Sequence, residues 1–141
     1  LAGAAAVDPA LGPLPLLLAL VLFLWTPPHF WSLAIAHRSD YAEAGIPMLP
    51  VVASYRETTN NILIYTLLVV ACSFGFGAAA GLGALYWVSA GALGAVFTWM
   101  SVQVRRTESP ATAMKLFTFS ITYVTLLFGV MAADVLLRQG W

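Results

Sequence analysis

The chain contains four long apolar segments, and they constrain its fold more than any other feature. They run at about residues 13–36, 62–80, 82–104 and 113–137. Each is close to the ~20 residues that a helix needs to cross a lipid bilayer. Only 9% of the residues are charged, whereas soluble domains carry about 25%. So few charges cannot cover a water-soluble surface, and the sequence therefore predicts a membrane protein.

The predicted secondary structure of these segments is helical. Within lipid every backbone N–H and C=O group needs a partner inside the protein, which leaves helices and closed β-barrels. The sequence does not show the ten-residue alternating strands that are typical of a barrel. We therefore predict an all-α, polytopic bundle of four transmembrane helices. The net charge of +0 gives no reason to expect a nucleic-acid partner.

The distribution of basic residues predicts the orientation of the bundle. Only Arg138 lies beyond the fourth segment, and the other five basic residues lie in or beside the first and third connections. Because basic connections stay in the cytoplasm, we expect residues 37–61 to form a cytoplasmic cap loop. Trp87 and Trp141 would then lie near the outer interface of the membrane.

The first apolar segment contains the element WTPPHFWS, residues 25–32. Pro27 and Pro28 are expected to interrupt the helix, because proline removes a hydrogen-bond donor and clashes with the carbonyl four residues earlier. His29 would lie about 12 Å inward of Arg38 at ~1.5 Å per residue. An ionisable ring at that depth normally faces the bundle interior or a wet cavity. The alternative is a purely structural kink, in which His29 satisfies the freed carbonyls.

Two polar stripes are predicted to lead inward from the cytoplasmic end. If the first helix continues, His29, Ala36 and Asp40 share one face, and Thr26 and Ser32 flank it. In the last segment one face carries a lysine followed by threonines, namely Lys115, Thr118, Thr122 and Thr125. A lysine that heads such a stripe favours an anion site, although it could instead extend to the lipid headgroups. Ser120 lies off this face.

The polar connection at 37–61 mixes both signs of charge and then turns apolar. Arg38, Asp40, Tyr41 and Glu43 could belong to a solvated loop. The stretch GIPMLP at 45–50 is stiff and apolar, so we expect it to pack as a cap over a cavity.

Two further predictions concern packing and the far end of the bundle. Asp134 is expected to be an interfacial residue, distant from the polar connection. Five glycines of the second and third segments are predicted to allow close helix packing, namely Gly75, Gly77, Gly81, Gly91 and Gly94.

The polar elements also resemble a known family. WTPPHFWSLAIAHRSDYAEAGIPMLPVV and KLFTFSITY resemble the C-terminal half of the protohaem IX farnesyltransferase (haem O synthase) family, which belongs to the UbiA-type intramembrane prenyltransferases. The W-x-x-P-H-F, D-Y-x-x-x-G-x-P-M-L-P and K-L-F-x-F-S-I elements occur in the family's order, and the resemblance covers about residues 14–134. We therefore expect a C-terminal part of a longer enzyme, inactive alone.

The resemblance implies both a fold and a reaction. The fold has nine transmembrane helices around a cavity that opens to the cytoplasm and to lipid, and these residues would supply the last four. The reaction joins farnesyl diphosphate to a vinyl group of haem B and yields haem O for haem-copper terminal oxidases. Mg²⁺ would be bound with the diphosphate. The implied location is the bacterial inner membrane, and the implied partners are the N-terminal half, haem A synthase or a second copy.

By the same resemblance, His29 and Asp40 are the candidate catalytic residues, with Asp40 and Glu43 as Mg²⁺ ligands. His29 could ligate iron, contact a propionate or take a proton from the water that adds. Candidate substrate-binding residues are Arg38, Tyr41, Lys115, Thr118 and Thr122. Two features depart from the family. The first Asp-rich motif is not in these residues, and Ala36 stands where many relatives have a carboxylate four residues before Asp40.

Three other functions remain open at this point. A relative of the same superfamily could prenylate a quinone precursor, although the P-H-F element favours haem. A transporter half-domain could use a broken helix and a histidine, but transporters place ionisable groups at mid-bilayer rather than in a terminal connection. A structural oxidase-assembly subunit would not need Arg38, Asp40 and Lys115 around one mouth.

Overall fold

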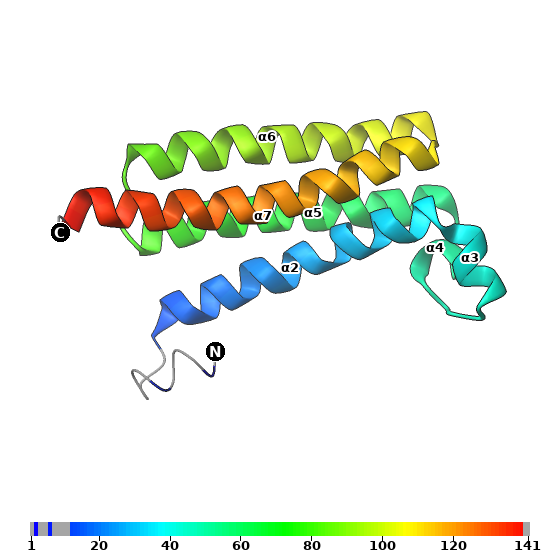
Figure 1. Ribbon diagram of the computed structural model, residues 1–141, viewed down its shortest axis with the longest axis horizontal. Helices are drawn as coiled ribbons and strands as arrows, with labels where there is room; N and C mark the ends of the chain where they lie inside the picture. The colour runs from blue at the N-terminus through cyan, green and yellow to red at the C-terminus, as the bar shows by residue number, and fades with distance from the viewer. Residues whose placement is uncertain (1, 3–5, 7–11, 140–141) are drawn as a thin grey trace.

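The computed structural model describes residues 2, 6 and 12–139, and four long helices lie side by side in it (Figure 1). They are α2 (Pro13–Ala36), α5 (Tyr55–Ala79), α6 (Ala84–Thr107) and α7 (Pro110–Gln139), with short helices α3 (Arg38–Glu43) and α4 (Leu49–Val52) after α2. The described part contains no strand. All four long helices are long and apolar enough to cross a membrane. The predicted all-α, four-span bundle is confirmed, while Trp141 lies outside the described residues.

Two of the long helices, α5 and α7, begin before their apolar segments, and residues at their starts explain this. Helix α5 begins at Tyr55 rather than near residue 62, since the Ser54 side chain accepts a hydrogen bond from the Glu57 amide (3.2 Å). This serine and the glutamate three residues later match a capping box. Helix α7 begins at Pro110, a residue well suited to a first helical turn. The cap expected as a loop at 37–61 therefore consists largely of α3, α4 and the first turns of α5.

Each long helix packs on two others, in the order α2, α5, α6, α7 and back to α2. Polar groups in the centre are paired across the helices. Tyr123 and Ser73 hydroxyls lie 2.9 Å apart, Tyr86 donates to the Ser73 carbonyl (2.9 Å), and Thr66 and Ser101 hydroxyls lie 3.0 Å apart. In the described residues every buried side-chain nitrogen and oxygen has a hydrogen-bond partner. This is what a bilayer, which offers no partners, requires.

The predicted interruption of α2 is wrong, because the helix runs unbroken through Pro27 and Pro28. Proline holds φ near −65°, which is close to the helical value, so the pair removes hydrogen bonds without forcing the chain out of the helix. Pro28 is buried against the neighbouring helices, and Thr26 donates to the Leu22 carbonyl (2.9 Å) just before the pair. Packing thus holds a locally weakened helix together.

The predicted stripe from His29 through Ala36 to Asp40 does not form either. Helix α2 ends at Ala36, where His37 takes φ −118° and ψ 34°, and Asp40 belongs to α3. Ser32 was expected to flank the stripe, but it is fully buried and donates to the His29 carbonyl (2.8 Å). Because the chain changes direction at His37, helical periodicity cannot relate residues on its two sides.

The glycines of α5 and α6 have different roles. A Cβ atom on Gly77 would lie 2.6 Å from Tyr86 Cε1, and one on Gly94 would lie 2.8 Å from Val70 Cγ1. These two glycines allow the close α5–α6 contact that was predicted. A Cβ on Gly75 or Gly81 would meet nothing within 4 Å, so the packing prediction is wrong there. Gly81 instead adopts φ +62° in the turn between the helices.

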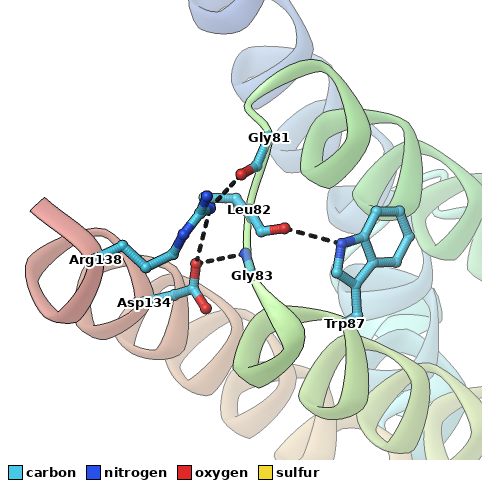
Figure 2. A network of polar contacts seen from close by, with 6 residues as sticks. All are labelled: Gly81, Leu82, Gly83, Trp87, Asp134 and Arg138. Atoms are coloured by element: carbon cyan, nitrogen blue, oxygen red, sulfur yellow. Dashed lines mark hydrogen bonds and ion pairs between the residues drawn. The ribbon is translucent and has the colours of Figure 1, made fainter.

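The turn between α5 and α6 is held by a carboxylate from α7 (Figure 2). Asp134 is only 3% exposed, and it accepts a hydrogen bond from the amide of Gly83 (2.7 Å), the N-cap of α6. Arg138 lies 3.9 Å from the same carboxylate and donates to the Gly81 carbonyl. A negative charge at a helix N-terminus is favourable. Asp134 therefore has a structural role, which the sequence did not predict, and it lies at the end of the bundle distant from α3.

We predict that Gly77→Ala destabilises the bundle by about 1–3 kcal/mol, because the added methyl group overlaps the buried Tyr86 ring. Gly75→Ala is the matched control, since its Cβ enters open space on the same helix. Thermal unfolding of both variants in detergent compares them directly. Equal melting temperatures for the two variants would contradict the close-packing role of Gly77.

We also predict that Asp134→Ala lowers the free energy of unfolding by about 1–3 kcal/mol, because the Gly83 amide loses its acceptor in a buried place. Glu43→Ala removes an exposed carboxylate at the other end of the bundle and should change stability little. The unfolding of both variants is measured in detergent. If Glu43→Ala lowered the free energy of unfolding as much as Asp134→Ala, the structural role of Asp134 would be refuted.

Candidate active site

His29 lies in the contact between α2 and α7, which we call the α2–α7 seam. It is seven residues from the end of α2, or about 10 Å at ~1.5 Å per residue. Its Nδ1 atom lies 2.7 Å from the Ser120 hydroxyl of α7. Trp25, one turn earlier on α2, donates its indole N–H to the Ser120 carbonyl (2.7 Å). A single buried serine thus bonds to two aromatic side chains of the facing helix.

Aromatic rings fix the plane of the imidazole. The His29 ring stacks on Trp25, with centroids 4.3 Å apart and planes 22° apart, and on Phe117 of α7 at 4.6 Å and 26°. Phe30 meets it edge-on at 5.2 Å, and this side chain is 47% exposed. Stacked and edge-on pairs are favourable beyond the area that they bury. The ring is therefore held in one orientation by both helices.

The second ring nitrogen of His29 is open. No described residue forms a hydrogen bond with Nε2. Every buried side-chain nitrogen of the described residues has a hydrogen-bond partner, so an unpartnered nitrogen cannot be a buried one. Nε2 is consequently an accessible atom. A ring nitrogen at this depth is costly to leave against lipid, so ionisable groups there normally face a cavity or another polar group. The open nitrogen marks the side of the seam on which a ligand could bind.

A depression of about 400 Å³ lies where α2 meets α3. The two helices meet at the end of the bundle that carries α4 (Figure 1). Asp40 and Tyr41, two of the predicted site residues, line it, and Asp40 lies 3.1 Å from Nδ1 of His37. His37 was not predicted, although its spacing of three residues from Asp40 allowed the contact. Arg38 and Glu43 are exposed on α3 and do not line this depression.

A second depression of about 330 Å³ lies on α7 and is lined by three predicted residues, Lys115, Thr118 and Thr122, together with Met114 and Phe119. Thr118 and Thr122 donate their hydroxyl hydrogens to carbonyls of their own helix (3.1 and 3.4 Å). Lys115 therefore supplies the charge of this surface. The two depressions share no lining residue, so Lys115 and Asp40 line separate depressions of the described chain.

The donor set for Mg²⁺ is partial. Among the described residues, no three His, Cys, Asp or Glu side chains gather closely enough to hold a metal ion. Asp40 and Glu43 are three residues apart on α3, so they project from neighbouring positions, and both are exposed. Mg²⁺ commonly binds through one or two carboxylates together with substrate phosphates and water. The two residues could therefore supply part of the ligands of a metal–diphosphate complex, but they do not form a complete metal site by themselves.

The comparison with known proteins identifies the family. The UbiA prenyltransferase family matches residues 1–130. The chain belongs to the UbiA prenyltransferase family. As a UbiA protein with four helices able to span a membrane, it is a multi-pass membrane protein. The resemblance that the sequence elements predicted is confirmed.

The similar proteins include several named "Protoheme IX farnesyltransferase". The chain is 47% identical to the protein from Parafrankia sp. (strain EAN1pec), and the alignment covers 97% of this chain and 45% of the relative. For Parvibaculum lavamentivorans the values are 40%, 98% and 45%, and for Roseiflexus sp. (strain RS-1) 44%, 95% and 25%. The chain thus spans a quarter to less than half of these relatives. No solved structure matches it.

Proposed function

We propose that these residues form the C-terminal part of an enzyme that transfers the farnesyl group of farnesyl diphosphate to a vinyl group of haem B, with haem O as the product. The chain's UbiA membership and its relatives' name support this proposal. One structural observation carries it: His29 is held between aromatic rings in the α2–α7 seam, with Nε2 open. The end of the bundle that carries α3 would face the cytoplasm of a bacterial cell, with the protein in its inner membrane.

The chemistry assigns different tasks to the two ends of the farnesyl donor. The bond between C1 and the diphosphate oxygen breaks, C1 bonds to the vinyl group, and water adds to the neighbouring carbon and loses a proton. Lys115 and Arg38 are the basic residues that would bind the leaving diphosphate, with Tyr41, Thr118 and Thr122 beside them. Mg²⁺ held by Asp40 and Glu43 would supply further neutralisation of the leaving group.

The apolar surroundings of His29 suit the second half of this reaction. A farnesyl cation must meet the vinyl group before it meets bulk water, which requires a largely dry site. Trp25, Phe30 and Phe117 provide flat apolar surfaces around the imidazole. A porphyrin is itself a flat aromatic ligand, and Phe30 is exposed to meet one. These surfaces favour haem over a small quinone precursor as the acceptor.

We predict that Asp40→Asn raises the Mg²⁺ concentration needed for half-maximal activity at least ~10-fold, on the order of 1.4 kcal/mol, because a metal-side charge is lost. The measurement is the Mg²⁺ dependence of farnesyl transfer by the intact protein, with its native flanking sequence. Glu57→Gln, which removes an exposed carboxylate at the same end of the bundle, is the control. An unchanged Mg²⁺ dependence for Asp40→Asn would place Asp40 in a merely solvated segment.

The direct test of the proposed function is product formation. Membranes with the intact protein, farnesyl diphosphate and Mg²⁺ should convert haem B into haem O, identified by mass spectrometry, and should not prenylate an aromatic quinone precursor. His29→Ala should abolish haem O while the protein stays folded, because Trp25 still donates to the Ser120 carbonyl. Prenylation of the quinone precursor alone would overturn the haem assignment, and normal turnover by His29→Ala would overturn the role of the histidine.

A further inference from the structure

Ser120 is fully buried, and its hydroxyl contacts two groups. The hydroxyl donates to the carbonyl of Phe117 (2.6 Å) and lies 2.7 Å from Nδ1 of His29. A serine hydroxyl has one hydrogen and two acceptor lone pairs. Because the Phe117 carbonyl can only accept, both contacts are hydrogen bonds only when the serine hydrogen points to Phe117 and the serine oxygen accepts from His29. This pairing places the hydrogen of the neutral imidazole on Nδ1.

Stacking keeps Nδ1 of the imidazole beside the Ser120 hydroxyl. Stacking on Trp25 and Phe117 opposes rotation of the imidazole, and both rings are anchored beside Ser120. Trp25 is bonded to the Ser120 carbonyl, and Phe117 supplies the carbonyl that receives the Ser120 hydrogen. The bond made by one ring nitrogen of a histidine decides the state of the other. The tautomer is thus set from α7, although the histidine belongs to α2.

We propose that Ser120 is a positioning residue, which holds His29 as the Nδ1–H tautomer and so leaves the Nε2 lone pair open toward the substrate. This inference rests on the proposed function for its catalytic meaning. In this tautomer Nε2 is an acceptor and not a donor. His29 can then ligate the haem iron or take the proton from the water that adds to the vinyl group, but it cannot donate a hydrogen bond from Nε2 to a propionate.

The bundle offers a matched control for this proposal. Ser101 is also fully buried and also bonds across a helix pair, to Thr66 (3.0 Å), but neither residue has a hydrogen bond to His29. Ser101→Ala and Ser120→Ala therefore make the same chemical change at equal burial. Ser120→Thr keeps the hydroxyl oxygen and should restore the bond to Nδ1. A role in stability alone would make the two alanine variants alike.

The test is the tautomer of His29 in the intact protein, labelled with ¹⁵N in its imidazole rings and observed by ¹H–¹⁵N NMR in detergent. The signals of His29 are identified as those that the His29→Ala spectrum lacks. Wild type, Ser101→Ala and Ser120→Thr should show Nδ1–H, whereas Ser120→Ala should show a substantial Nε2–H fraction. Ser120→Ala should also lower kcat for haem O by about 10–100-fold, without raising the KM for farnesyl diphosphate.

Each outcome separates this inference from the proposed function. An Nε2–H tautomer in the wild type, or a Ser120→Ala spectrum with the wild-type tautomer, overturns the positioning role. Loss of the Nδ1–H state in Ser101→Ala as well would also overturn it, because the effect would then be general to the fold. The expected spectra in a wild-type protein that makes no haem O would support the positioning role and refute the proposed function.

Discussion

The structure depends on one constraint: inside a bilayer, each polar group needs a partner that the protein itself supplies. Ser73 serves both Tyr86 and Tyr123, Thr66 pairs with Ser101, and Asp134 holds the turn before α6. Every one of these contacts ties two helices together. The Nε2 atom of His29 differs from these paired groups, because it has no partner among the described residues although two helices hold its ring in place. A membrane protein keeps such an atom where a ligand or water will meet it.

The same constraint links the α2–α7 seam to the proposed chemistry. The backbone carbonyl of Ser120 bonds to Trp25, and the hydroxyl of Ser120 bonds to His29. The same residue therefore holds α2 against α7 and contacts the candidate site. A diphosphate would lie nearer the end of the bundle, where Lys115 and Asp40 are exposed in two separate depressions. The parts of a longer enzyme that these residues do not include would have to join the two depressions across the substrate.

Much of the fold could be predicted because it follows from local physics. Apolar length identified four spans, and the resemblance identified the family before any contact was known. The predictions failed where contacts between distant residues outweigh the local preference of the sequence. Pro27 and Pro28 lower helix stability, yet the buried contacts of α2 hold the helix together. The structural role of Asp134 could not be predicted, because its partner Gly83 is 51 residues earlier in the chain. Ser120 was set aside for the same reason, since only the fold brings it to His29, 91 residues away.

Photo-crosslinking tests most directly the central claim that the open side of the α2–α7 seam is the substrate side. A farnesyl diphosphate analogue with a photoreactive group on its isoprenoid chain would be irradiated with the intact protein, and the labelled peptides identified by mass spectrometry. Labels within residues 22–33 of α2 and 114–122 of α7, lost with excess farnesyl diphosphate, are the predicted result. Competable labels confined to the outer faces of α5 and α6, such as those at Leu67 or Trp99, would contradict the account.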